Sequence, residues 1–163
     1  MYLVEPAHRP SRRAPLVWAI GAAIPWLFLM VAQTVWFVID GMDGRYGWAH
    51  LLLAAGTVVG IVVFVFVVPV WRYRVHRWDV DPTAVYTRSG WLVQERRIAP
   101  ISRVQTVDTY RGPLDRVFGL ANVTVTTASS AGAVRIVALD SEVADRVVAQ
   151  LTDIAALGAE DAT

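Results

Sequence analysis

The chain has 163 residues, of which 55% are hydrophobic, and its formal net charge at pH 7 is +1. This hydrophobic share is high for a soluble domain and indicates membrane spans, while the small net charge gives no field that would attract nucleic acid. The sequence contains no cysteine, which excludes disulfides, thiolate catalysis and sulfur-ligated metals.

Residues 1–15 form a polar leader with three arginines and with prolines that disfavour a helix. The charge-free apolar run that follows covers residues 16–39. Since about 20 residues cross the hydrocarbon core, this run predicts an uncleaved membrane span rather than a signal peptide. Pro25 lies inside the span and is expected to cause a passive kink, with a functional hinge as the alternative.

A second charge-free run covers residues 48–70, after a short glycine-rich turn. So short a connection predicts an antiparallel membrane hairpin over residues 16–70. Gly56 and Gly60 have the spacing that lets membrane helices approach closely, so they form either a helix-packing seam or two ordinary membrane glycines. We interpret His50 as an interfacial residue rather than a proton relay, because no intramembrane acid partners it.

The placement of arginines predicts the orientation of the hairpin. The turn between the spans carries Asp40 and Asp43 against Arg45 alone. By contrast, arginines flank the other end of both spans: Arg9, Arg12 and Arg13 before the first, Arg72, Arg74 and Arg77 after the second. Positive residues favour the cytoplasmic side, so both termini are expected to be cytoplasmic and the protein to cross the membrane twice.

From residue 71 onward the pattern changes to the period of a β-strand. Arg72, Arg74 and His76 alternate with apolar neighbours, and a shift of phase near Arg77 suggests a bulge. Further strands are expected over residues 84–88, 91–98, 104–111, 122–127 and 134–139, with a tight hairpin at residues 89–90 and one helical turn at 114–118.

A helix is expected to follow the last strand, starting at residues 140–142. Val143, Val147, Leu151 and Ile154 fall on one stripe at helical spacing, which predicts an amphipathic helix packed against the strands. Residues 158–163 are small and acidic and are expected to form a frayed tail.

Three pieces of sequence then point to a family: SGWL at residues 89–92, RRIAPISRVQTV at 96–107 and LDRVFGLANVTV at 114–125. In this order and spacing they closely resemble the bacterial pleckstrin-homology (PH) family of YdbS-like membrane proteins. The resemblance covers residues 70–151. It implies an α+β chain in the bacterial inner membrane, with a PH-like antiparallel β-barrel or sandwich over residues 71–157, capped by a C-terminal helix and attached to the two-helix transmembrane hairpin.

The sequence carries few of the motifs that mark enzymes, so we expect no catalytic residue, cofactor or metal. No histidine pair has metal-ligand spacing, and no nucleophile or phosphate-loop motif is present. Asp115 lies in the helical turn predicted at 114–118 and is interpreted as a local cap rather than a catalytic group. Beyond the lipid bilayer itself, the expected partner is a protein or a second copy of the chain.

Three functions remain open at this point. The first is a membrane-anchored interaction or scaffold module at the cytoplasmic face. The second is binding of anionic lipid headgroups by a basic cluster next to the membrane, although these residues also satisfy the positive-inside rule: Arg72, Arg74, His76 and Arg77. The third is an accessory subunit of a transport or envelope-stress complex, with the hairpin as its contact surface.

Overall fold

The computed structural model describes residues 5–40, 46–128 and 132–160. Its chain divides into two compact units, which are described separately: a helical unit, Pro15–Val70, and a β unit that combines Met1–Ala14 with Trp71–Thr163. Most of the predicted turn between the spans (residues 41–45), residues 129–131 and the end of the predicted tail (residues 161–163) lie outside the described residues.

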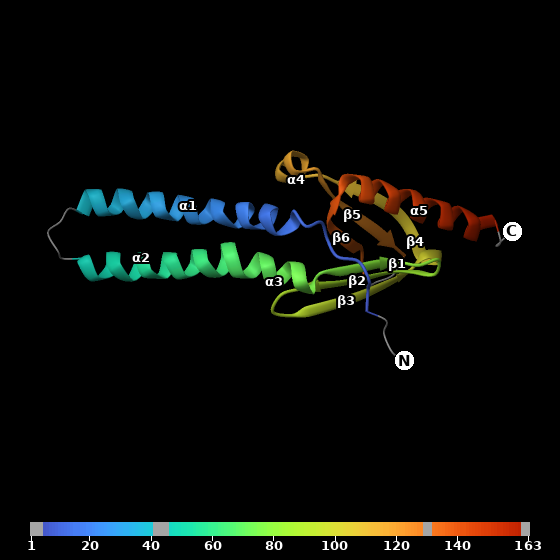
Figure 1. Ribbon diagram of the computed structural model, residues 1–163, viewed down its shortest axis with the longest axis horizontal. Coiled ribbons are helices and arrows are strands. Elements are labelled where there is room, and N and C mark those ends of the chain that lie inside the picture. Colours follow the sequence, from blue (N-terminus) through green and yellow to red (C-terminus); the bar gives the residue numbers. More distant parts are fainter. Residues whose placement is uncertain (1–4, 41–45, 129–131, 161–163) are drawn as a thin grey trace. The chain divides into compact units, whose positions relative to one another are not determined.

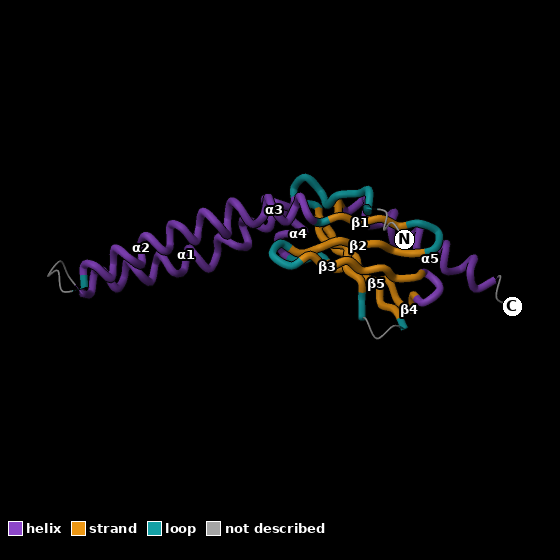
Figure 2. Tube along the Cα trace, turned by 90° about the horizontal axis from the view of Figure 1, so that it is seen from below, coloured by secondary structure: helices purple, strands orange, loops and turns teal. Residues whose placement is uncertain are grey.

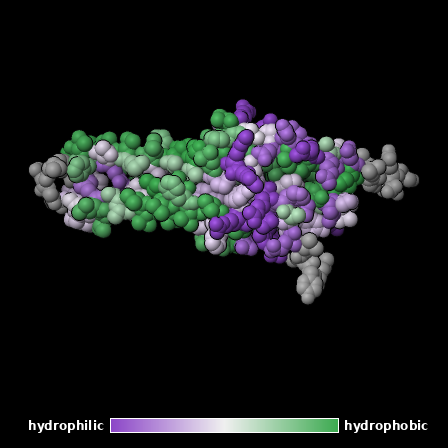
Figure 3. All heavy atoms as spheres, in the orientation of Figure 1, coloured by the Kyte–Doolittle hydropathy of each residue, from purple (hydrophilic) through white to green (hydrophobic). Residues whose placement is uncertain are grey.

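Two long helices run through the described part of the helical unit, and the second extends past Val70 into the first residues of the β unit after it. The first, α1 (Ala14–Asp40), is continuous through Pro25. The second consists of α2 (Gly47–Ile61), a π-helical segment η1 (Val62–Val67) and α3 (Val68–Val75) in direct succession. Helices over Ala14–Ile39 and Gly47–Val75 are long and apolar enough to cross a membrane, and apolar side chains line both (Figure 3). The two predicted helices are thus confirmed as candidate spans.

The strand predicted from residue 71 is wrong, because α3 continues as a helix to Val75. The backbone N–H of His76 still donates to the carbonyl of Arg72, at 2.8 Å, as in an α-helix. Extending an existing helix adds a hydrogen bond for each residue fixed, whereas starting a strand here would need a partner strand. The alternation of polar and apolar residues was too short to distinguish the two.

The described residues of the β unit form six strands in two antiparallel sheets (Figures 1 and 2). The first sheet has the order β1-β2-β3, from β1 (Arg77–Val80), β2 (Ala84–Gly90) and β3 (Gln94–Pro100). A 3-10 turn, η2 (Ile101–Arg103), leads to the second sheet, which has the order β4-β5-β6. Its strands are β4 (Val104–Tyr110), β5 (Leu120–Thr127) and β6 (Val134–Asp140), with a short helix, α4 (Pro113–Phe118), between the first two.

The antiparallel strands are as predicted, but the closed barrel is not. Within the described residues no ladder of hydrogen bonds joins the two sheets, which remain two separate three-stranded sheets. A sequence pattern reports which face of a strand is buried, and this is the same whether the sheets close or only pack together.

The turn between β2 and β3 also differs from the prediction. Residues 89–90 belong to β2, and the loop is Trp91-Leu92-Val93, because Gly90 pairs with Gln94. Gly90 has a φ of +112°, and a Cβ atom there would overlap the carbonyl oxygen of Val93. Only glycine fits this position without strain, so the glycine fixes the shape of the loop.

One core joins α5 (Ser141–Glu160) to both sheets, and the first sheet contributes Trp78, Val85 and Ala99 to it. The predicted alternation is confirmed, since Val123 and Val125 are fully buried. The predicted helix stripe is also confirmed, with Val147 and Leu151 buried and Val143 and Ile154 packed against the core. The helix includes residues 158–160, which the prediction had placed in the tail.

Candidate functional site: the N-terminal leader and the cavity beside it

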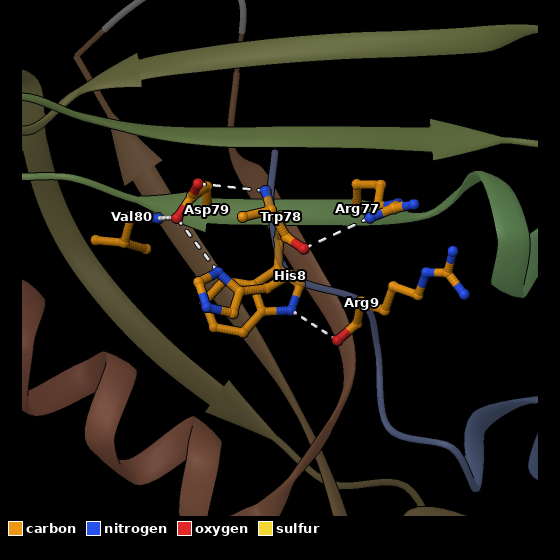
Figure 4. A network of polar contacts seen from close by, with 7 residues as sticks. His8, Arg9, Arg77, Trp78, Asp79 and Val80 are labelled. Atoms are coloured by element: carbon orange, nitrogen blue, oxygen red, sulfur yellow. Dashed lines mark hydrogen bonds and ion pairs between the residues drawn. The ribbon is translucent and has the colours of Figure 1, made fainter. Parts of the chain in front are cut away.

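The leader segment, residues 5–13, packs against the outer edge of β1 (Figure 4). The backbone N–H of His8 donates to the carbonyl of Trp78, and the N–H of Trp78 donates back to His8, both at 3.0 Å. The indole N–H of Trp78 donates to the carbonyl of Arg9 at 3.2 Å, and the His8 ring stacks on the indole with centroids 4.8 Å apart. The leader therefore covers a free edge of the first sheet.

Ser11 connects the leader to the second sheet. This residue is buried, its N–H donates to the carbonyl of Ala138 at 2.8 Å, and its hydroxyl donates to Asp140 at 2.7 Å. Ala138 is a non-glycine residue with a positive φ of 54° at an irregularity in the β5–β6 pairing. The side-chain oxygen of Asn122 accepts the N–H of Ala138 at 2.8 Å, so the irregularity is held on both sides.

A cavity of about 920 Å³ lies between the leader and the start of α5. Arg13 reaches the carbonyl of Phe118 at 3.1 Å, and the guanidinium of Arg9 lies 6.0 Å from the ring centre of Tyr73. The lining combines leader arginines with acidic residues at the start of α5: Arg9, Ser11, Arg12, Arg13, Tyr73, Gly119, Asp140, Ser141 and Glu142. Three guanidinium groups and the amino-terminal end of a long helix favour an anion, and two carboxylates oppose it.

The basic cluster predicted after the second span does not form one surface. Arg74 is exposed, Arg72 is half-buried, and His76 is buried with its Nδ1 atom 2.8 Å from the carbonyl oxygen of Arg72. Arg77 is half-buried and extends toward the carbonyl of Ala7, at 3.5 Å. The leader segment thus covers part of this cluster.

Burial lowers the pKa of His76 below its ordinary value of 6.5. The hydrogen bond to the Arg72 carbonyl opposes this shift, and the positive charge of Arg72 adds to it. An imidazole in this position is neutral at pH 7 and donates from Nδ1 to the carbonyl oxygen. His76 therefore fixes the end of α3 instead of presenting a positive charge.

The two glycines of the predicted seam have different surroundings. Gly60 is buried, and a Cβ atom there would overlap the indole ring of Trp26 in α1. Gly56 is exposed, and nothing lies within 4 Å of the position of its Cβ atom. Close approach of the two helices therefore depends on Gly60 and not on Gly56.

Polar residues inside the helical unit are used for packing between the helices. The amide of Gln33 in α1 donates to the hydroxyl of Thr57 in α2 at 2.6 Å, and that hydroxyl donates to the carbonyl of Leu53. The His50 ring lies against Trp36 and Phe37, with centroids 4.3 and 5.3 Å away. These contacts support a structural role for the polar residues of the spans.

Among the described residues, no group of three His, Cys, Asp or Glu side chains could hold a metal ion. Asp115 accepts the N–H of Gly112 at 3.0 Å and the side-chain amide of Asn122 at 2.9 Å. This carboxylate caps α4, as the sequence predicted. The role of the leader was missed, although its prolines favour the extended backbone that an edge strand needs.

Two candidate membrane helices are followed by antiparallel sheets and a C-terminal helix, which is the order that the resemblance implied for a membrane-attached PH-like domain. The model of the Bacterial PH domain family matches residues 16–155, and the chain belongs to this family. Among curated proteins, UPF0699 transmembrane protein YdbS of Bacillus subtilis (strain 168) is 37% identical over 119 residues, which is 70% of each chain. No solved structure matches the chain significantly.

Proposed function

We propose that the chain is a non-enzymatic interaction module, which a membrane hairpin holds at the cytoplasmic face of the bacterial membrane and which there binds a protein partner or a second copy of itself. The leader supports the hairpin topology. It precedes the first candidate span, yet it is hydrogen-bonded to β1, which follows the second. Two segments of one folded unit lie on the same side of a membrane, so the chain between them crosses it an even number of times. The surplus of flanking arginines favours the cytoplasmic side.

The observation that carries this proposal is the exposed edge of β4. Among the described strands, β4 is hydrogen-bonded to β5 alone. Five of its residues are exposed: Gln105, Thr106, Asp108, Thr109 and Tyr110. An uncovered edge presents unpaired N–H and C=O groups, to which an extended segment of another chain can add as a further strand.

A photo-crosslinking amino acid at Tyr110, which is 66% exposed, tests this edge in the full-length protein in cells. The matched control carries the same amino acid at Gln150, on the exposed face of α5. A discrete crosslinked species is expected at Tyr110 and not at Gln150. It should disappear with Thr109→Lys, because a charge on an edge strand opposes further pairing, and persist with Ala149→Lys on α5. Equal crosslinking at both positions would remove the support for the module.

The cavity beside the leader favours a second function, the binding of a phosphate-bearing lipid headgroup. Arg9, Arg12 and Arg13 are exposed and lie immediately before α1, which begins at Ala14. Guanidinium groups bind phosphate oxygens through paired hydrogen bonds, and anionic lipids concentrate at the cytoplasmic surface. The site proposed here differs from the cluster after the second span, where Arg74 alone is exposed.

Thermal unfolding of the purified full-length protein, in detergent with and without phosphatidylglycerol, tests this second function. The lipid should raise Tm, and Arg12→Gln should reduce the increase. Arg146→Gln, which removes an exposed charge from α5 outside the cavity, should leave it intact. Inorganic phosphate replaces the lipid in a parallel series, which distinguishes a headgroup from a free anion. An equal loss in both variants would show only general charge attraction.

A further inference from the structure

We propose that the tip of the β2–β3 hairpin, Trp91-Leu92-Val93, inserts into the lipid bilayer at the level where the second membrane helix leaves it. This contact is separate from the β4 edge and from the leader cavity, and it does not depend on either.

The tip is apolar and faces outward. Leu92 is 77% exposed, Val93 is 80% exposed and Trp91 is 37% exposed. Three consecutive large apolar residues at the end of a hairpin cannot belong to the core of the β unit. Their exposure in water is unfavourable, and burial in the membrane interface would relieve it.

A hydrogen bond ties this tip to the chain next to the membrane. The indole N–H of Trp71 donates to the carbonyl of Trp91 at 3.0 Å, and both residues belong to the β unit. The tip lies beside the end of α3 in both ribbon views (Figures 1 and 2). The position of the tip relative to the bilayer therefore follows from that of Trp71.

The length of the second helix places Trp71 at the membrane interface. The candidate span covers Gly47–Val75, 29 residues, whereas about 20 residues cross the hydrocarbon core. The excess lies mostly at the end that carries Arg72, the first charged residue after the apolar run. Tryptophan concentrates at the boundary between hydrocarbon and headgroups, so Trp71 and the tip bonded to it are expected at that depth.

The hairpin behind the tip carries charges that suit an anionic surface. Arg96 is exposed on β3 and pairs in register with Arg88 on β2. Arg88 is already bound to Glu5 at 2.7 Å, and Glu95 binds Arg97 at 2.7 Å. Arg96 and the exposed Arg74 remain as basic groups at headgroup level, behind an apolar end. This combination favours a lipid surface over a second copy of the chain, whose arginines would repel.

The loop has the rigidity that such a contact needs. Gly90, with its φ of +112°, closes the turn against the carbonyl of Val93, and β2 and β3 are paired along their whole length. Since the strands already hold the tip in place, insertion costs little additional ordering of the backbone.

The absence of cysteine allows a direct measurement of depth. Leu92→Cys in the full-length chain is labelled with an environment-sensitive fluorophore and reconstituted into vesicles of phosphatidylcholine and phosphatidylglycerol. Ser102→Cys is the matched control, because it is exposed in η2 beyond the far end of β3, about 20 Å along the strand. The label at position 92 should show blue-shifted emission and quenching by lipids with a nitroxide in the upper acyl chain. The label at position 102 should respond to aqueous iodide instead.

Two results would overturn the proposal. Equal quenching of both labels by iodide would place the tip in water. Protection of position 92 from iodide without quenching by nitroxide lipids would place a protein surface on the tip. Val93→Asp in the Leu92→Cys background should restore iodide quenching, while Val117→Asp, at a valine that is 78% exposed on α4, should have no effect. Neither result would change the crosslinking expected at Tyr110 on β4, because that test does not depend on the depth of the tip.

Discussion

Single residues decide how the ends of the helices in the β unit are held. Asp115 caps α4, and Gly119 then takes a left-handed φ of 68° that ends the helix. Both roles could be predicted, because a Gly-Pro pair, an early acid and a closing glycine act over a few neighbouring residues. The role of His76 could not, since its burial depends on segments that are far away in the sequence.

His76 gives the residue-scale prediction, which concerns pH. Its pKa is lowered in the folded protein, mainly by burial, while the unfolded chain keeps the ordinary value of 6.5. The unfolded state therefore binds a proton first as the pH falls. The stability that the neutral ring contributes is complete above about pH 6.5 and is lost as the pH falls through the lowered value.

The free energy of unfolding in denaturant, measured on the full-length protein in detergent between about pH 7 and pH 5, checks this effect. It should fall with pH in the native chain, and less steeply in His76→Gln, whose amide does not titrate. The same slope in both proteins would mean that other groups cause the dependence.

At the scale of the elements, local patterns predicted what each segment does but not what it pairs with. The alternation in β5 and the stripe on α5 were sufficient because one face of each is buried. The end of the second span was not predictable in this way. Residues 71–76 alternate like a strand, but residues 71–75 continue a helix that the apolar run had already started. The leader contacts the edge of β1 through main-chain hydrogen bonds. Because every sequence has these groups, no side-chain pattern predicted the contact.

Packing between α1 and α2 gives the prediction at this scale. Gly60→Val should destabilise the helical unit by about 1–3 kcal/mol, because the new side chain would overlap the indole of Trp26. Gly56→Val should have little effect, since the space around it is open. Unfolding in mixed detergent micelles containing increasing amounts of SDS compares the two variants. Equal destabilisation would show that packing at the indole is not the cause.

The same pair tests whether the hairpin binds another membrane protein. Gly56 is exposed and Gly60 is covered by Trp26, so a surface for a partner would include Gly56. A partner that copurifies with the native chain and is lost from Gly56→Val, while the β unit stays folded, would support the accessory-subunit hypothesis. Retention of the partner would exclude this face of α2 as the contact.

At the scale of the whole molecule, the leader predicts the topology. Single cysteines at Arg12 and Ser102, both exposed in the β unit, should be labelled by a membrane-impermeant maleimide from the cytoplasmic side only. A cysteine at Met42, between the two candidate spans, should be labelled only from outside. Cell suspensions and inverted vesicles provide the two sides. Labelling of Arg12→Cys and Ser102→Cys from opposite sides would contradict the contact between the leader and β1.

The bond between Ser11 and Asp140 has a consequence for synthesis. The two residues are 129 positions apart. At elongation rates of about 5–20 residues per second, Asp140 is synthesised about 6 to 26 seconds after Ser11. Both candidate spans are translated within that interval. The helical unit is thus an insertion within a discontinuous β unit, which can close only after the insertion has been completed. A gene fragment that starts at β1 would encode this domain without the segment that covers its first edge.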